Sequence, residues 1–338
     1  MSENSRRMIA PLNWPAVVEE AVRRRKAENL TQREHAALAS VSVPTISAFD
    51  RGETTLTLAK VFDILRVVGL IEEIAEDGAQ EGFVREAYAR WRSLTAPLPD
   101  GAPARFPHGG YRIDYCLEGD LKSVSLTEFE RILRDAVVRR TGWPPFWVPT
   151  REELAPREVD GAIECWLAPS PIAGVERMFQ DAAHCDFWRG APSGRMFLLR
   201  GYQEDGQETF SPGTVMDTML PIWRMGEALL HAERLATLLR KSDSSAITVR
   251  FRALYWGLSG RVLRAWSNPL SDLLIEGHAA RGDEAMLETV LPAEDISERM
   301  AEHLFPLVSS LYERFGVAGL SQSRITAEVD RLLQSRVS

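Results

Sequence analysis

Aromatic and arginine side chains recur together in the C-terminal part of the chain, in short stretches, one of them at residues 184–190, that also contain glycine or proline and are typical of loops. Aromatic rings can stack on a flat ligand, and an arginine can donate two parallel hydrogen bonds to a carboxylate or a phosphate. These residue types predict a small-ligand pocket, although core tryptophans and surface arginine–aromatic pairs produce the same pattern. The predicted ligand-binding residues are Trp188, Arg189, Arg200, Tyr202, Trp223, Trp256 and Arg261.

Familiar catalytic motifs do not occur in the sequence. There is no GxSxG, no GxxxxGK(S/T), no HExxH and no GxGxxG. His184 could act as a base with a distant carboxylate, and Glu204 with Asp205 could bind a metal, but a solvated turn explains the second pair better. We therefore expect no enzymatic activity, no catalytic residue, no metal site and no cofactor.

Composition places the chain among soluble folded proteins. It has 338 residues, a net charge of −8 and 45% hydrophobic residues, which suggests two or three domains. It contains no run of ~18 apolar residues, the length of a membrane-spanning helix, and its N-terminus has no apolar core of a secretion signal. Its three cysteines are far apart and form no CxxC. These features predict a reduced, cytoplasmic setting without membrane contact or structural zinc.

Charge is distributed unevenly along the chain. Residues 1–70 contain 10 Lys and Arg against 8 Asp and Glu, so their net charge is +2 and the remainder of the chain carries −10. A surface that binds nucleic acid is therefore expected in residues 1–70. The acidic remainder favours a different ligand or partner.

Four helical patterns follow one another within residues 14–70. An apolar face recurs at helical spacing from Trp14 to Val22, and a basic run ends this helix at residues 23–26. Thr31 and Glu34 have the spacing of a capping box before a short second helix. Ser42 can cap a third helix. Residues 58–68 form a fourth helix, and its apolar face is expected to close the core with Leu58, Val61, Phe62, Leu65 and Val68.

The segments LTQREHAALASVS, TIS, DRGETTLTLAKV and ILRVVGL resemble the phage-repressor (Xre/Cro-type) helix-turn-helix family over about residues 14–70. The resemblance implies a domain of five short helices that binds DNA, usually as a dimer on a near-palindromic site. The larger region from Tyr111 onward distantly resembles an uncharacterised C-terminal module of bacterial helix-turn-helix and Schlafen-type proteins, which implies no chemistry.

The family pattern assigns DNA contacts to this sequence. Gln32, after the cap Thr31, matches a phosphate contact, and Ser42 matches the cap of the recognition helix. Base-facing positions fall on Val43, Pro44 and Ala48. The remaining positions of the predicted DNA-binding set are Thr45, Ser47 and, near the backbone of the DNA, Arg51. Since valine, proline and alanine offer only apolar contact, we expect weak, thymine-directed reading of sequence.

Residues 71–110 contain an acidic helical segment and then a stretch rich in proline and glycine, which predicts a linker at residues 95–110. From Tyr111 onward, strand patterns at 111–117, 161–167, 194–202, 246–258 and 285–291 mix with helical patterns at 125–142, 221–241 and 294–316. Because strands and helices do not alternate strictly, we predict an α+β domain over residues 111–338 with a mostly antiparallel sheet.

These observations favour a multi-domain transcriptional regulator, in which a helix-turn-helix domain binds double-stranded DNA as a repressor and the α+β domain dimerises and senses a ligand or partner. The helices that begin near Pro221 and Pro292 are the expected dimer interface, because residues 1–70 show no spare apolar face. Two alternatives remain open. One is a defence-type, nucleic-acid-processing effector that its helix-turn-helix targets, and the other is an antitoxin-like autorepressor.

Overall fold

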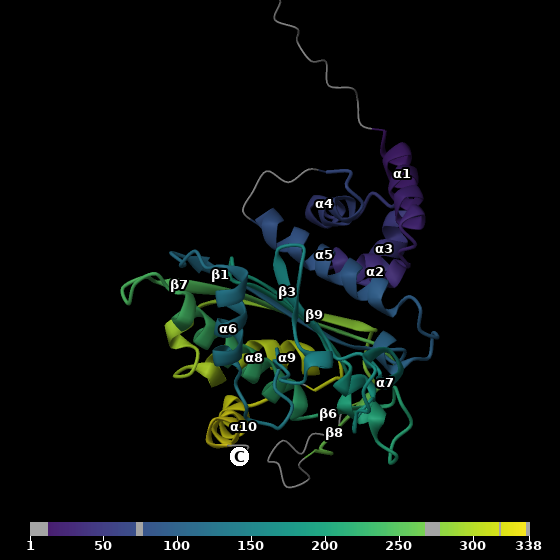
Figure 1. The fold of residues 1–338 in the computed structure, drawn as a ribbon. Coiled ribbons are helices and arrows are strands. Elements are labelled where there is room, and N and C mark those ends of the chain that lie inside the picture. Colours follow the sequence, from purple (N-terminus) through teal and green to yellow (C-terminus); the bar gives the residue numbers. More distant parts are fainter. Residues whose placement is uncertain (1–12, 72–76, 268–277, 318, 336–338) are drawn as a thin grey trace, which may run out of the picture. The chain divides into compact units, whose positions relative to one another are not determined.

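The computed structural model describes residues 13–71, 77–267, 278–317 and 319–335 (Figure 1). Its chain divides into two compact units, residues 1–75 and 76–338. Residues 72–76, at the start of the predicted acidic segment, lie outside the described residues.

Four helices make up the described part of the first unit, one fewer than the family resemblance predicts. They are α1 (Trp14–Ala27), α2 (Gln32–Leu38), α3 (Val43–Asp50) and α4 (Leu58–Val67). The capping box at α2 is confirmed, since the Thr31 side chain accepts from the Glu34 backbone and the Glu34 carboxylate accepts from the Thr31 backbone. The Ser42 hydroxyl accepts from the backbone N–H of Thr45, as expected for its cap position. The short polar caps therefore fix where α2 and α3 begin.

Side chains from all four helices make up the core of the first unit. Val61, Leu65 and Val68 are buried, as predicted. Leu58 and Phe62, however, are 64% and 37% exposed, so the prediction that they also close the core is wrong. They lie one turn apart on the outer face of α4. The first unit therefore has an exposed apolar surface, which the sequence analysis did not expect.

A seven-stranded antiparallel sheet organises the second unit. Its order is β2-β3-β4-β5-β1-β7-β9, and a separate parallel pair joins β6 to β8. The strands span β1 (Gly110–Gly119), β2 (Arg157–Val159), β3 (Ala162–Trp166), β4 (Phe187–Ala191), β5 (Arg195–Gly201), β6 (Val215–Asp217), β7 (Ile247–Trp256), β8 (Val262–Arg264) and β9 (Glu284–Pro292). The predicted α+β class with a mostly antiparallel sheet is confirmed.

Helices cover the apolar face of this sheet. The helices are α6 (Leu126–Ala136), α8 (Leu220–Leu239), α9 (Met300–Glu313) and α10 (Gln322–Gln334), with the single turn α7 (Ser170–Ala173) in a loop. The α8 and α9 helices lie against one face of the sheet (Figure 1). Alternate residues of β1 and β7 are buried in the core on that face, as the period of a strand requires. Of the 20 residues of α8, 15 are buried, so α8 is a core helix and its predicted role as a dimer interface is wrong.

The opposite face of the sheet combines buried charged residues with apolar ones and is covered by α5 (Asp77–Thr95). The Asp114 carboxylate on β1 accepts from Arg252 of β7 and from Gln80 of α5. Residues 95–110, predicted as a linker, pack within this unit, because Phe106 is 4% exposed and stacks on Trp91 at 5.6 Å. The proline- and glycine-rich composition therefore reflects tight turns around buried aromatic rings.

Two helix predictions need correction. The α6 helix ends at Ala136 and not at Gly142, because the backbone N–H groups of Arg140 and Thr141 donate to the Glu227 carboxylate of α8. The pattern at residues 294–316 contains a 3₁₀ turn, Ala293–Asp295, before α9 begins at Met300. Sequence analysis also assigned a loop to residues 187–191, which form the buried strand β4, and it did not predict α10.

The first prediction concerns His35, which is fully buried in α2 and whose Nε2 bonds to the carbonyl of Ile64 at 3.0 Å. Burial lowers the pKa of His35 below its ordinary value of 6.5. The unfolded chain therefore binds the proton first, and the first unit should lose stability as pH falls below about 6.5, by up to ~1.4 kcal/mol per pH unit. Hydrogen exchange of the α2 and α4 amides, corrected for intrinsic rates, should show this loss. His35→Leu should abolish it; a variant with unchanged pH dependence would contradict the assignment.

The second prediction uses two helical glycines. A Cβ on Gly226 of α8 would lie 2.6 Å from Leu332 of α10, whereas one on Gly82 of α5 would meet only the end of Arg85 at 4.0 Å. Gly226→Ala should therefore cost about 1–3 kcal/mol through overpacking. Gly82→Ala should stabilise α5 by about 0.5–1 kcal/mol. Urea unfolding of both variants tests the helix contact, and equal effects of the two substitutions would refute it.

Candidate nucleic-acid interface and ligand pocket

The predicted recognition helix is α3, which begins after Ser42. The hydroxyl of Ser42 lies 2.9 Å from that of Thr45, so the two side chains support each other at the start of the helix. Pro44 is exposed, while Val43, Thr45 and Ser47 are half-buried. The accessible first turn of α3 is therefore mostly apolar, with one pair of hydroxyls at its edge.

Ala48 does not belong to the accessible surface of α3. It is only 8% exposed and lies between the buried positions Ile46 and Phe49. A methyl group packed into the core cannot also contact a base. The assignment of Ala48 as base-facing is therefore corrected, because the helix turns this position inward.

The start of α2 is tied to the end of α3 by a buried ion pair. Arg25 of α1 donates to both oxygens of Asp50, at 2.8 and 2.7 Å, and the Gln32 amide donates to the same carboxylate at 2.6 Å. The two charged side chains are only 7% and 14% exposed. Gln32 and the cap Thr31 are exposed at the surface, so they remain accessible to a phosphate, although the amide of Gln32 is already used.

Positive charge near α3 is partly neutralised. The Arg51 side chain is 63% exposed and pairs with Glu53 at 2.6 Å, a surface contact that a phosphate can replace at little cost. At the end of α1, Arg23 and Arg24 both bind Glu20, and hydrogen bonds from these two arginines lower the pKa of Glu20 to about 2. Arg51 and Arg23, at 63% and 67% exposure, are thus both accessible to a phosphate, and Arg51 is the one that lies at the end of α3.

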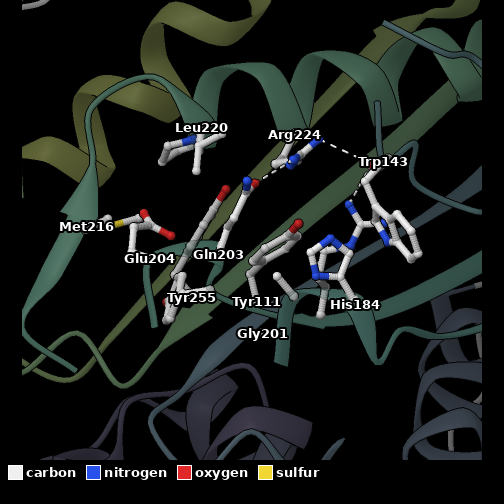
Figure 2. Close-up of a pocket in the computed structure, with 14 residues that line it drawn as sticks. Tyr111, Trp143, His184, Gly201, Gln203, Glu204, Met216, Leu220, Arg224 and Tyr255 are labelled. Carbon is white, nitrogen blue, oxygen red and sulfur yellow. Dashed lines mark hydrogen bonds between the residues drawn. The ribbon is translucent and has the colours of Figure 1, made fainter. Parts of the chain in front are cut away.

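A pocket in the second unit lies between β1, β5, β7 and the first turn of α8 (Figure 2). Its lining residues are Tyr111, Trp143, Ala183, His184, Arg200, Gly201, Tyr202, Gln203, Glu204, Met216, Leu220, Pro221, Arg224 and Tyr255. Only Arg200 and Tyr202 among them come from the predicted ligand set.

Both of these residues are anchored within the protein. Arg200 binds both oxygens of Asp186, and its other N–H groups donate to the carbonyls of Trp143 and Pro144. The Tyr202 hydroxyl donates to the carbonyl of Trp256 at 2.9 Å. They shape the pocket wall, and their strongest polar contacts point away from a ligand.

The other predicted ligand residues do not line the pocket. Arg261 is fully buried, binds Asp205 at 2.6 Å and lies 4.1 Å above the ring of Tyr202. Arg189 is held by Glu164 on the face of the sheet that α5 covers. The prediction fails here because buried arginines need carboxylate partners, and those partners are distant in sequence.

The predicted tryptophans are packing residues. Trp188 is 1% exposed, and its Nε1 donates to the carbonyl of Trp147 at 2.8 Å. Trp223 packs against the core from α8, and Trp256 lies 6.3 Å from Phe106 by ring centroids. None of the three lines the pocket.

Sequence analysis missed a pair of tyrosines that face the pocket. Tyr111 and Tyr255 are direct cross-strand partners of β1 and β7, and their rings stack at 5.6 Å. Neither hydroxyl has a hydrogen-bond partner of ordinary geometry among the described residues. Burial raises the pKa of Tyr111, and the nearby Arg200 opposes that rise. Alternation within the predicted strands placed both rings on the core face, but strand pairing was needed to bring them together.

Arg224 and Gln203 close the opposite side of the pocket. The Nη1 of Arg224 donates to Thr141, Trp143 and Glu227, and its Nη2 donates to the amide oxygen of Gln203 at 3.1 Å. This bond orients the amide of Gln203 so that its NH₂ group is directed elsewhere. Sequence analysis placed Arg224 on a helix without recognising that it faces a cavity.

Glu204 sits at the end of the pocket beside Asp217. Burial raises the pKa of Glu204 to about 7, and the charge of Asp217 adds to the rise. Asp217 itself is fully buried and accepts from the backbone N–H groups of Met219 and Leu220 and of residues 266 and 267. It thereby binds the first backbone N–H groups of α8 beside Glu204.

His184 forms the rim of the pocket. Its Nδ1 lies 2.7 Å from the carboxylate of Asp181, and its ring lies between Trp143 and Phe179, at 4.5 and 4.7 Å.

No group of three or more potential metal ligands occurs among the described residues, and Glu204 and Asp205 are engaged with other partners. In the same part of the chain, no helix is long and apolar enough to cross a membrane.

Comparison with known proteins bears on the first unit. No curated protein and no solved structure matches the chain. Residues 23–72 match a family model described as helix-turn-helix, which extends from the end of α1 past α4. This match supports DNA binding by the first unit. Residues 23–72 are similar to helix-turn-helix domains of the Xre/Cro type.

Proposed function

We propose that the protein is a transcriptional repressor that binds DNA through α2 and α3 and senses a ligand through its second unit. The observation that carries this proposal is the match of residues 23–72 to the helix-turn-helix family, together with the exposed first turn of α3. In this proposal the second unit binds a ligand and does not catalyse a reaction.

Recognition of DNA sequence rests on the first turn of α3. Val43 and Pro44 can contact thymine methyl groups, and the hydroxyls of Thr45 and Ser47 can reach an acceptor. Such contacts discriminate less than a paired arginine–guanine contact, which is worth about 1–3 kcal/mol. Phosphate contacts and DNA shape therefore supply much of the affinity.

The third prediction tests the docking surface. Arg51→Glu places a negative charge where we expect a phosphate, so it should weaken binding to the upstream region of the protein's own gene about tenfold or more. Arg131→Glu on α6 is a matched control, because the two arginine side chains are 63% and 67% exposed and both pair with carboxylates. Fluorescence anisotropy with labelled duplex should separate the two variants. Equal affinities of Arg51→Glu and the parent would rule out this docking mode.

Dimerisation would compensate for weak contacts by a single helix-turn-helix. Joining two such domains makes the second contact intramolecular and raises avidity by about 10²–10⁴. A stable interface buries at least ~1,000 Å², which Leu58 and Phe62 of α4 cannot supply alone. We therefore assign the dimer contact to residues 77–338.

The fourth prediction follows from this assignment. Light scattering should give a dimer for the full chain and a monomer for residues 1–71. The shorter chain should bind the same DNA at least ~100-fold more weakly at physiological salt. A monomeric full chain, or a dimeric fragment, would contradict the assignment.

A further inference from the structure

The pocket of the second unit contains more hydrogen-bond donors than the protein uses. Tyr255 is 1% exposed, and no described residue bonds to its hydroxyl. Leaving a buried hydroxyl without a partner is costly, so a natural ligand that supplied the partner would recover that cost. On the neighbouring strand, Arg200 lies close to the Tyr111 oxygen, but no described residue accepts the hydrogen of that hydroxyl.

Arg224 adds further donors from the opposite side of the pocket. Its Nη2 gives one hydrogen to Gln203 and retains a second, and no described residue accepts from its Nε. The Gln203 amide oxygen is occupied by Arg224, which leaves the NH₂ group as the free end. Figure 2 shows both tyrosine hydroxyls directed toward the region where Gln203 and Arg224 meet. A ligand bound there must therefore be rich in acceptors.

The charges around the pocket restrict the kind of acceptor. Arg200 is paired with Asp186, and Arg224 is paired with Glu227, so neither guanidinium contributes a net positive charge. The start of α8 is likewise already occupied by Asp217. A doubly charged phosphate would find no net counter-charge, and a cation would leave the spare donors of Tyr255 and Arg224 unused. A singly charged group with two acceptor oxygens fits this balance best.

The remaining walls are apolar or aromatic. Met216, Leu220 and Pro221 enclose one side, and the rings of Trp143 and Tyr202 enclose the other. These walls suit a short alkyl or small planar substituent. We propose that this pocket binds a small monocarboxylate, whose oxygens accept from the hydroxyls of Tyr111 and Tyr255 and from Arg224. Such a ligand would specify what the second unit senses. Its biological purpose, but not its binding, rests on the proposed function.

Glu204 makes binding dependent on pH. Its carboxyl, with a pKa raised by burial to about 7, faces the charged groups Asp217 and Arg261 and the buried phenols of Tyr255 and Tyr312. A ligand carboxylate is repelled by ionised Glu204 and can accept a hydrogen bond from the protonated form. Carboxylate affinity should therefore rise as pH falls from about 8 to about 6.

Calorimetric titration of the full chain tests the proposal with propionate, propionamide and inorganic phosphate as probes. At about pH 6.5, propionate should bind with a Kd on the order of 1 mM or tighter, while the amide and phosphate should bind at least ~10-fold more weakly. Tyr255→Phe should weaken propionate about tenfold without lowering thermal stability, because its hydroxyl has no partner in the protein. Glu204→Gln should remove the pH dependence.

Tyr115→Phe is the matched control, because the Tyr115 hydroxyl is bonded to His231 at 2.7 Å and does not line the pocket. It should lower stability and leave propionate affinity unchanged. Absence of propionate binding, equal binding of propionamide or phosphate, or unchanged affinity of Tyr255→Phe would each overturn the proposal. These titrations contain no DNA, so their failure and the failure of DNA binding by the first unit are separate results.

Discussion

A buried charge is tolerated only where a partner of opposite charge or several hydrogen-bond donors meet it with good geometry, and this constraint shapes both units. In the first unit, Arg25 meets Asp50 within a nearly closed environment and Gln32 completes the contact. The pair links α1, α2 and α3 through side chains rather than through the turn alone. Loss of either partner would leave an uncompensated charge against the core, so the position of the recognition helix depends on this contact.

In the second unit the same constraint places three carboxylates at fixed points. Asp186 holds Arg200, Glu227 holds Arg224 together with the backbone after α6, and Asp217 caps α8. Because these charges are consumed internally, the pocket between them is close to neutral. What remains unpaired there are neutral hydroxyls and spare N–H groups, which is why the pocket suits a weakly charged, acceptor-rich ligand.

Local chemistry made much of the first unit predictable. Capping by Thr31 and Ser42 and the apolar spacing of the helices require no knowledge of distant residues, and the structure agrees with them. Alternation in 246–258 likewise predicted β7. The prediction failed for Leu58 and Phe62. An apolar helix face shows that burying its side chains is favourable, but it does not show how many of those side chains a small core can hold.

The pocket could not be predicted well, because its residues interact with partners that are distant in sequence. The aromatic and charged residues of 187–191 suggested a loop, yet they form β4, since Arg189 has its carboxylate partner in β3. The end of α6 depends on Glu227, about ninety residues away. Tyr111 and Tyr255 become a site only through the register of β1 and β7. None of these partners can be identified from residue types or spacing alone.

Hydrogen exchange of the full chain, with and without duplex DNA from its own upstream region, tests the central claim most directly. If the protein binds DNA through its helix-turn-helix, added protection should concentrate in peptides that cover residues 31–52, which contain α2 and α3. A scrambled duplex of equal length should protect the same peptides less. Protection that appears only in residues 77–335, or no change in α2 and α3 at saturating DNA, would contradict the account.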